Sequence, residues 1–137
     1  MNSFNELKKL KTLLVDDDEL IRDSLKIAFS AKGCAMRVAE SAEEGLEAIA
    51  EEEFDIIISD FRLPCMNGLE FLKLAAISHP DAVRLLITAY RDDHIFPEAV
   101  RIGVNEFIEK PFSVKVFVNL LALAIKHQEI NRAAAAK

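Results

Sequence analysis

Cysteine is scarce in this chain of 137 residues, and the two that occur, Cys34 and Cys65, form no CxxC pair. A disulfide framework is therefore not expected, and the reducing cytoplasm is the natural compartment. No apolar run approaches the roughly 18 residues that suggest a membrane span, and residues 1–10 do not resemble a signal peptide. These absences predict a cytosolic protein that does not enter the membrane.

Positive charge is also scarce, since 17 Lys and Arg face 23 Asp and Glu and the net charge is −6. Nucleic-acid affinity rests largely on Lys and Arg that neutralise phosphates, so this segment is not expected to bind nucleic acid directly. Apolar residues, by contrast, make up 51% of the chain. This composition and length predict one globular domain with its own core.

The domain is expected to span residues 11–128, preceded by an N-terminal extension at 1–10 and followed by a tail at 129–137. The tail ends in AAAAK, and alanine is the best helix former. It therefore extends the last helix, forms the stub of a linker, or is an artificial addition.

Short apolar segments alternate with segments of helical periodicity. Strands are expected at 11–16, 34–39, 54–59, 82–88 and 106–109, and helices at 18–32, 41–52, 69–77, 92–102 and 113–128. The third strand reads FDIIIS, an apolar run typical of a strand buried on both faces of a parallel sheet. Five strand–helix units predict an α/β fold, a doubly wound five-stranded parallel sheet of flavodoxin-like order 2-1-3-4-5 with helices on both faces.

Pro97 bears on where the helix at 92–102 begins. Proline inside a helix removes a backbone hydrogen bond, whereas proline in the first turn is tolerated. The helix is therefore expected to begin near Phe96, with Asp92 to Ile95 forming a loop.

The polar residues that end the strands are expected to meet, because ligands of a doubly wound sheet bind beyond the carboxyl ends of its strands. Asp16 and Asp17 end the first strand, Asp60 the third, Thr88 the fourth and Lys110 the fifth. Clustered carboxylates favour a hard divalent cation such as Mg²⁺. The cluster predicts that Asp60 is a nucleophile for phosphoryl transfer, with Lys110 and Thr88 contacting phosphoryl oxygens.

Each of these residues also has a structural explanation when it is taken alone. Asp16 and Asp17 suit the cap of the next helix, Asp60 suits a turn, and an isolated lysine is usually solvated. Their joint occurrence at strand ends favours the site. Asp55 serves as a contrast, because it begins the same strand roughly 16 Å from Asp60 and is not expected to reach the cluster.

Four segments, LLVDDDEL, DIIISDFRLPCMNGLEFL, LLITAY and FIEKPF, follow one another with the spacing of response-regulator receiver domains, which the chain resembles over residues 11–126. The resemblance implies that Asp60 is the phosphoacceptor. It also implies a Mg²⁺ or Mn²⁺ site and a lysine that contacts the phosphoryl group. It further implies a switch pair, in which a hydroxyl moves toward the phosphoryl group and an aromatic ring turns inward behind it. For the metal, the resemblance implies Asp16, Asp17, Asp60 and the backbone carbonyl of Arg62. For the switch, it implies Thr88 and Phe107. The lysine is Lys110, whose bond to Pro111 is expected to be cis.

The resemblance implies a phosphorylation-controlled switch rather than a metabolic enzyme. The phosphoryl donor is a histidine kinase or a phosphotransfer protein, and the domain catalyses only its own phosphorylation and dephosphorylation. The output face comprises the helix near 96–102, the strand 106–109 and the helix 113–128, with a phosphorylation-driven homodimer as one outcome. The domain is expected to be the N-terminal receiver of a longer, DNA-binding regulator. The alternative is a stand-alone regulator that acts by protein contact.

Two other classes fit the residues less well. Aspartyl phosphatases of the haloacid dehalogenase type carry a second Asp two residues after the nucleophile, where this chain has Arg62. A pseudo-receiver would lack part of the acidic pocket or the lysine, and this chain keeps both. Arg62 is also expected to overhang the site and alter the lifetime of the acyl phosphate.

Overall fold

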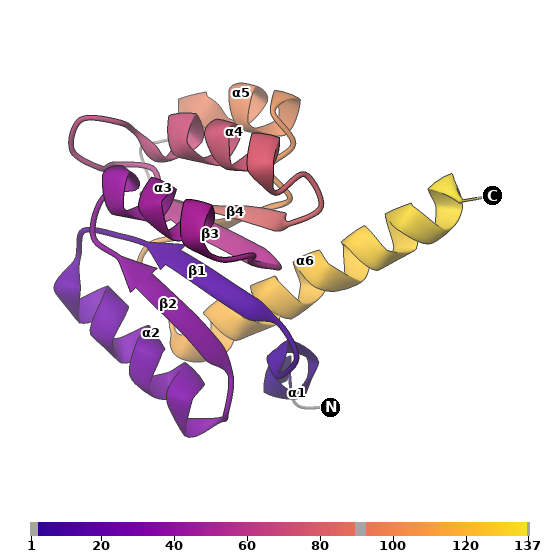
Figure 1. Cartoon of the computed structure of the whole chain (residues 1–137), viewed down its shortest axis with the longest axis horizontal. Helices are drawn as coiled ribbons and strands as arrows, with labels where there is room; N and C mark the ends of the chain where they lie inside the picture. Colours follow the sequence, from indigo (N-terminus) through magenta and orange to yellow (C-terminus); the bar gives the residue numbers. More distant parts are fainter. Residues whose placement is uncertain (1–2, 90–92, 137) are drawn as a thin grey trace.

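The computed structural model describes residues 3–89 and 93–136 (Figure 1). The strands are β1 (Lys11–Val15), β2 (Ala35–Ala39), β3 (Ile56–Asp60), β4 (Val83–Thr88) and β5 (Glu106–Glu109). The helices are α1 (Ser3–Leu7), α2 (Glu19–Ala31), α3 (Ala42–Glu51), α4 (Gly68–Ser78), α5 (Phe96–Arg101) and α6 (Val114–Ala135), and a 3-10 turn, η1, spans Asp93–Ile95. No helix within the described ranges has both the length and the apolar character to cross a membrane.

The strands form one sheet in the order β2-β1-β3-β4-β5, and every neighbouring pair is parallel. The predicted fold is therefore confirmed. β1 and β3 lie side by side with Val15 opposite Ser59, so both strands end at the same edge. This edge is the point where the strand order reverses, and it is where a ligand of such a sheet binds.

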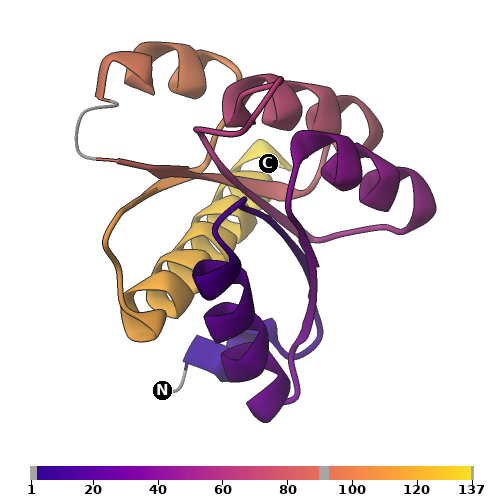
Figure 2. The same ribbon diagram turned by 90° about the vertical axis from the view of Figure 1, so that its left-hand side faces the viewer.

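Helices cover both faces of the sheet, with α3, α4 and α5 on one and α1, α2 and α6 on the other (Figure 2). The alternation of side chains along each strand divides the core between these faces. In β3, Ile57 packs under α3 and α4, whereas Ile56 and Ile58 pack toward α2 and α6, and all three are 0% exposed. The strand within the apolar FDIIIS run is thus buried on both faces of the sheet, as its composition indicated.

Side-chain caps begin four of the helices. The carboxylate of Asp18 accepts hydrogen bonds from the backbone N–H groups of Leu20 and Ile21 at the start of α2. Ser41, Asn67 and Ser113 accept equivalent bonds at the starts of α3, α4 and α6. These caps satisfy backbone donors that a helix leaves unpaired at its first turn.

Helix α5 begins at Phe96 with Pro97 in its first turn, as predicted. The preceding residues differ from the expected loop, because residues 93–95 form the 3-10 turn η1. A 3-10 turn commonly precedes an α-helix and does not need the amide that proline lacks. Asp92, which the sequence placed in the same loop, lies outside the described residues.

The two ends of the chain contain helix that the sequence pattern did not assign. Residues 3–7 form α1, which packs against α6 and buries Leu7 to 1% exposure. Helix α6 continues to Ala135 rather than stopping near residue 128. Its last turns run past the sheet (Figure 1), where Gln128 and Arg132 donate hydrogen bonds to the backbone carbonyl of Asp81. Residues 129–135 therefore continue the last helix.

Candidate functional site

Three carboxylates converge at the carboxyl edge of β1 and β3. One oxygen each from Asp16, Asp17 and Asp60 lies within 4.8 Å of the other two. Asp16 is fully buried, Asp60 is 5% exposed, and Asp17 is exposed. The structure therefore brings together the three acidic residues that the sequence assigned to one site, with two of them taken out of water.

Asp16 is held by bonds to its backbone and to one of its carboxylate oxygens. Its N–H donates to the carbonyl of Ala39, Oδ1 accepts the Asp18 N–H at 2.9 Å, and Arg22 Nη1 donates to the Asp16 carbonyl at 2.9 Å. Its Oδ2 is buried and has no hydrogen-bond partner within the described chain. One carboxylate oxygen is therefore left facing the cluster.

Lys110 supplies the positive charge at this edge. Its Nζ lies 3.1 Å from Asp60 Oδ2 and 3.5 Å from Asp16 Oδ2. The Lys110 N–H donates to the carbonyl of Thr88 at 2.8 Å, which ties the end of β5 to the end of β4. The bond to Pro111 is cis, as the resemblance implied.

The carboxylates are poorly stabilised as charged groups. Burial, together with repulsion from Asp16, raises the pKa of Asp60 to about 6, although Lys110 opposes the shift. Burial also raises the pKa of Asp16, and the bond from Asp18 and the charge of Lys110 only partly offset this. Burial opposes the charged form of Lys110, but attraction to Asp16 and Asp60 outweighs it and the pKa is raised. The site therefore holds more negative charge than its one ammonium compensates.

A divalent cation fits this donor set. The available ligands are carboxylate oxygens, which hard cations such as Mg²⁺ prefer. The buried Oδ2 of Asp16 accepts no hydrogen bond and has only the Lys110 ammonium near it, at 3.5 Å, and a buried acceptor without a hydrogen bond has a cost that a ligand would relieve. The backbone carbonyl of Arg62, placed directly after β3, stays a predicted fourth ligand.

Thr88 and Phe107, the predicted switch pair, lie on the neighbouring strands β4 and β5. Thr88 is the last residue of β4 and is 2% exposed, and Phe107 lies in β5, paired with Leu86. The Phe107 ring is partly buried and packs against Phe96, with centroids 4.6 Å apart. Thr88 thus lies at the carboxyl edge of the sheet, and the ring of Phe107 contacts the first residue of α5.

Gly68 contacts the backbone of the site, although the sequence pattern assigned no role to it. A Cβ at Gly68 would lie 2.1 Å from the backbone oxygen of Asp60. The Gly68 N–H donates to the carbonyl of Phe61 at 2.8 Å, so α4 begins in direct contact with the chain that carries Asp60. The signal available in the sequence was a glycine at the start of a helix eight residues after the phosphoacceptor candidate.

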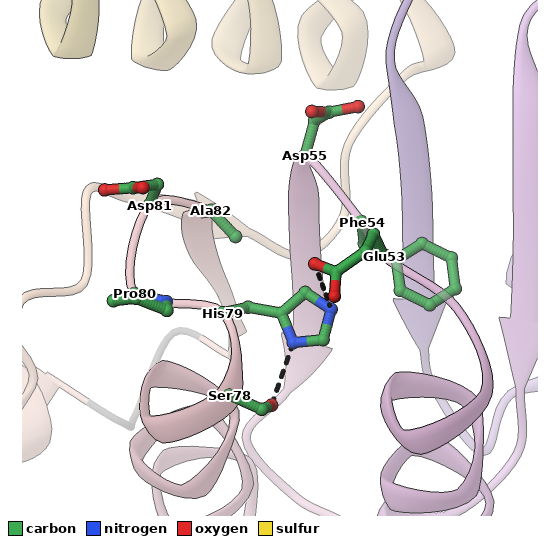
Figure 3. A pocket seen from close by; sticks show the side chains of 8 residues that line it. All are labelled: Glu53, Phe54, Asp55, Ser78, His79, Pro80, Asp81 and Ala82. Atoms are coloured by element: carbon green, nitrogen blue, oxygen red, sulfur yellow. Dashed lines mark hydrogen bonds and ion pairs between the residues drawn. The ribbon is translucent and has the colours of Figure 1, made fainter.

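The amino edge of the sheet also carries acidic residues, around a cavity of about 190 Å³ next to His79 (Figure 3). Only Glu53 turns toward the His79 ring, at 3.5 Å, whereas the carboxylates of Asp55 and Asp81 point away from it. Asp55 instead accepts the Lys11 N–H at 2.8 Å. As predicted, Asp55 lies far from the cluster, and the carboxylates at this edge do not converge.

Comparison with known proteins agrees with this geometry. The family model of the response regulator receiver domain matches residues 12–122. A receiver domain of the chemotaxis type from Methanospirillum hungatei superposes with a TM-score of 0.82 at 30% identity, covering 89% of this chain and 98% of that one. Brucella abortus NtrX superposes with a TM-score of 0.82 at 26% identity, over 92% of this chain and 29% of that protein.

Related sequences belong to longer regulators. The DNA-binding transcriptional regulator NtrC of Proteus hauseri is 32% identical over 88% of this chain and 26% of that protein. The response regulator FleR of Pseudomonas aeruginosa is 35% identical over 82% of this chain and 24% of that protein. The chain thus spans about a quarter of the length of these relatives. With the family model matching most of its length and the acidic cluster at the expected strand ends, the chain belongs to the response regulator receiver domain family of two-component systems.

Proposed function

We propose that this domain accepts a phosphoryl group on Asp60 from a phosphohistidine of a sensor kinase or phosphotransfer protein. The observation that carries the proposal is the buried Asp60 carboxylate, which lies within reach of both the Lys110 ammonium and the Asp16 carboxylate. A carboxylate whose pKa is raised only to about 6 is still mostly ionised at neutral pH, as a nucleophile must be.

Asp16, Asp17, Asp60 and the Arg62 carbonyl would hold Mg²⁺ or Mn²⁺. The bound cation supplies charge neutralisation for the phosphoryl oxygens. An oxygen of Asp60 forms the new O–P bond as the P–N bond of the donor breaks, and the imidazole leaves with the electron pair. Lys110 then pairs with a phosphoryl oxygen instead of Asp60, and the Thr88 hydroxyl donates to another. The residues catalyse only their own modification and its hydrolysis, so the domain is not proposed to turn over a metabolite.

The phosphoryl donor is proposed to dock beside Lys110. A hollow of about 370 Å³ lies there between α2 and residues 110–114, lined mainly by apolar side chains. Leu20, in the first turn of α2, is 74% exposed at its rim. An exposed leucine beside the nucleophile suits a protein partner rather than a small phosphate ester, since apolar surface of this kind marks contact sites.

Output is proposed through the α5–β5–α6 face, to which Phe107 and Phe96 belong. The exposed side of α6 carries Val116, Leu123 and Ile130, at 48%, 41% and 56% exposure and seven residues apart. Seven-residue spacing is that of a helix–helix seam, which supports the phosphorylation-driven homodimer. By analogy with NtrC and FleR, the domain at residues 11–128 is proposed as the N-terminal receiver of a longer, DNA-binding regulator acting in the cytoplasm.

The phosphoacceptor assignment is tested by incubating the protein with Mg²⁺ and acetyl phosphate and measuring its intact mass. The expected result is the gain of one phosphoryl group in the wild type and in Asp55→Asn, and no gain in Asp60→Asn. Asp55 is the matched control because it lies on the same segment at the other end of β3. A gain that persists in Asp60→Asn would overturn the assignment, and so would no gain in the wild type.

A further inference from the structure

Arg84 is a buried cation that the chemistry of the site does not use. It lies in β4, is 9% exposed, and points to the face covered by α4 and α5. In the described parts of the chain its guanidinium meets backbone carbonyls and no carboxylate. Burial lowers the pKa of Arg84, yet a guanidinium stays charged in proteins. Such a charge is retained in a core only where several acceptors surround it.

The acceptors of Arg84 come from two helices. Nη1 donates to the Leu72 carbonyl of α4 at 3.1 Å, and Nη2 donates to the carbonyls of Ile102 at 2.8 Å and Gly103 at 3.2 Å, directly after α5. The last carbonyls of a helix carry partial negative charge, which favours a cation there. Arg84 therefore joins the end of α5 to the middle of α4.

The backbone next to Arg84 reinforces this junction. The Arg84 N–H donates to Asn105 Oδ1 at 2.8 Å, and the Asn105 N–H donates to the Arg84 carbonyl at 2.7 Å. Gly103 has φ +87°, and a Cβ there would lie 2.7 Å from Arg84 Nη2. The chain at 102–105 is thus fitted around the guanidinium.

The opposite end of α5 is held by apolar packing rather than by polar bonds among the described residues. Its N-cap residue, Ile95, is buried in the core at 6% exposure but makes no side-chain capping bond, and Pro97 in the first turn has no N–H to donate. Phe96 is 37% exposed, and its ring contacts that of Phe107 at 4.6 Å between centroids. One end of this six-residue helix is thus hydrogen-bonded to a buried charge, whereas the other end is held by the packing of Ile95 and Phe96.

We propose that Arg84 is a positioning residue that fixes the carboxyl end of α5, so that switching moves the Phe96 end and leaves residues 102–105 in place. The proposal rests on the proposed function, because it takes phosphorylation of Asp60 as the signal. Thr88 and Arg84 lie on the same face of β4, four residues or roughly 13 Å apart. One strand therefore carries both Thr88, the predicted phosphoryl contact, and the residue that anchors the helix that responds.

The test is residue-resolved amide hydrogen exchange on the domain, with and without Mg²⁺ and acetyl phosphate. The amides of Ile102, Gly103, Val104 and Asn105 are all hydrogen-bonded and report on the anchored end. Those of Phe96 and Phe107 report on the moving end. Arg84→Lys keeps the charge but loses the fork that reaches two helices at once. The matched control is Arg101→Lys on α5, an exposed arginine that pairs with Glu98.

Without phosphorylation, Arg84→Lys is expected to exchange at least about tenfold faster at residues 102–105 while the β3 amides are unchanged. Arg101→Lys is expected to match the wild type. Equal protection at 102–105 in Arg84→Lys and wild type would overturn the proposal. A uniform rise over the whole domain would also overturn it, since that indicates general destabilisation. This comparison needs no phosphoryl group, so it decides the role of Arg84 even if Asp60 gains none.

With acetyl phosphate, wild-type exchange is expected to change at Phe96 and Phe107 and to stay within about twofold at residues 102–105. In Arg84→Lys the change is expected to spread to 102–105, with the same gain of mass as in the wild type. An equal phosphorylation-dependent change at both ends of α5 in the wild type would overturn the pivot. Loss of the mass gain in the wild type would instead overturn the phosphoacceptor assignment.

Discussion

The two edges of the sheet carry similar numbers of acidic side chains but use them in opposite ways. At the amino edge, Glu52 lies at the surface, and hydrogen bonds from Lys11 and Arg37 lower its pKa. At the carboxyl edge, burial and the neighbouring Asp16 raise the pKa of Asp60 to about 6. Acidity alone therefore does not mark a site. A site is marked where buried carboxylates converge, because burial and mutual repulsion raise their pKa.

The largest expected effect comes from a pair of glycines at the two edges. Gly68→Ala places a Cβ 2.1 Å from the Asp60 carbonyl, and backbone on both sides must shift. We expect a loss of more than about 3 kcal/mol in the free energy of unfolding, together with loss of phosphorylation. Gly33→Ala is the control, because Gly33 has φ +72° but open space around it, and about 1 kcal/mol is expected. Urea denaturation of both variants measures the difference, and equal losses would contradict the close approach at Asp60.

Asp60→Asn is expected to stabilise the metal-free protein by about 2 kcal/mol at neutral pH, because it removes a buried charge. The folded-state pKa of Asp60 is about 6 against 3.8 for the free group. A raised acid pKa means that its contribution to stability is complete below pH 3.8 and is lost as pH rises through about 6. Thermal unfolding in EDTA between pH 4 and 8 measures this. The gain of Asp60→Asn is expected to grow from pH 4 to about 6 and to level off above it, and a gain that does not depend on pH would mean that burial of the charge is not its cause.

A smaller effect is expected from the cation itself. Mg²⁺ at about five times its dissociation constant should stabilise the wild type by about 1 kcal/mol through mass action. Asp16→Asn should lose most of this increment, because it replaces a buried carboxylate, one oxygen of which accepts no hydrogen bond, by a neutral amide. Glu53→Gln at the amino edge should keep the increment. Unfolding midpoints with and without Mg²⁺ measure it, and an equal shift in both variants would mean that Mg²⁺ binds elsewhere.

The smallest effect is expected at Glu52, because salt and water screen its surface ion pairs with Lys11 and Arg37. Because its pKa is lowered in the folded state, Glu52 contributes stability above its ordinary pKa, and this is lost as pH falls. Glu52→Gln should therefore change stability only near the limit of detection, with a pH trend opposite to that of Asp60→Asn. A change in stability as large as that of Asp60→Asn would contradict the difference between buried carboxylates at one edge and screened carboxylates at the other.

The sequence was sufficient for the sheet order and for the convergence of the acidic residues. The order was predicted from five strand–helix units and right-handed crossovers, and strand polarity then places Asp16 and Asp60 at one edge and Asp55 at the other. The start of α5 at Phe96 also follows from a local rule, because it depends on Pro97 in the first turn.

Features that depend on tertiary contacts were not predictable in the same way. Gly68 looked like an ordinary loop glycine because the atom that it must avoid belongs to Asp60, at the end of another element. Arg84 looked like one polar residue in an apolar strand, since its acceptors come from α4 and from the end of α5. The helix at 3–7 is too short to show a period, and it is stabilised by packing of Leu7 on the core.

The hydrogen bonds from Gln128 and Arg132 to the Asp81 carbonyl fix the direction in which α6 leaves the sheet. A helix of 22 residues is a rod of about 33 Å, and each residue turns it by about 100°. The number of residues in the helix therefore sets the direction of any group joined to its end. Adding one alanine would swing an attached group by more than a quarter turn, whereas adding seven would restore nearly the original direction about 10 Å farther out.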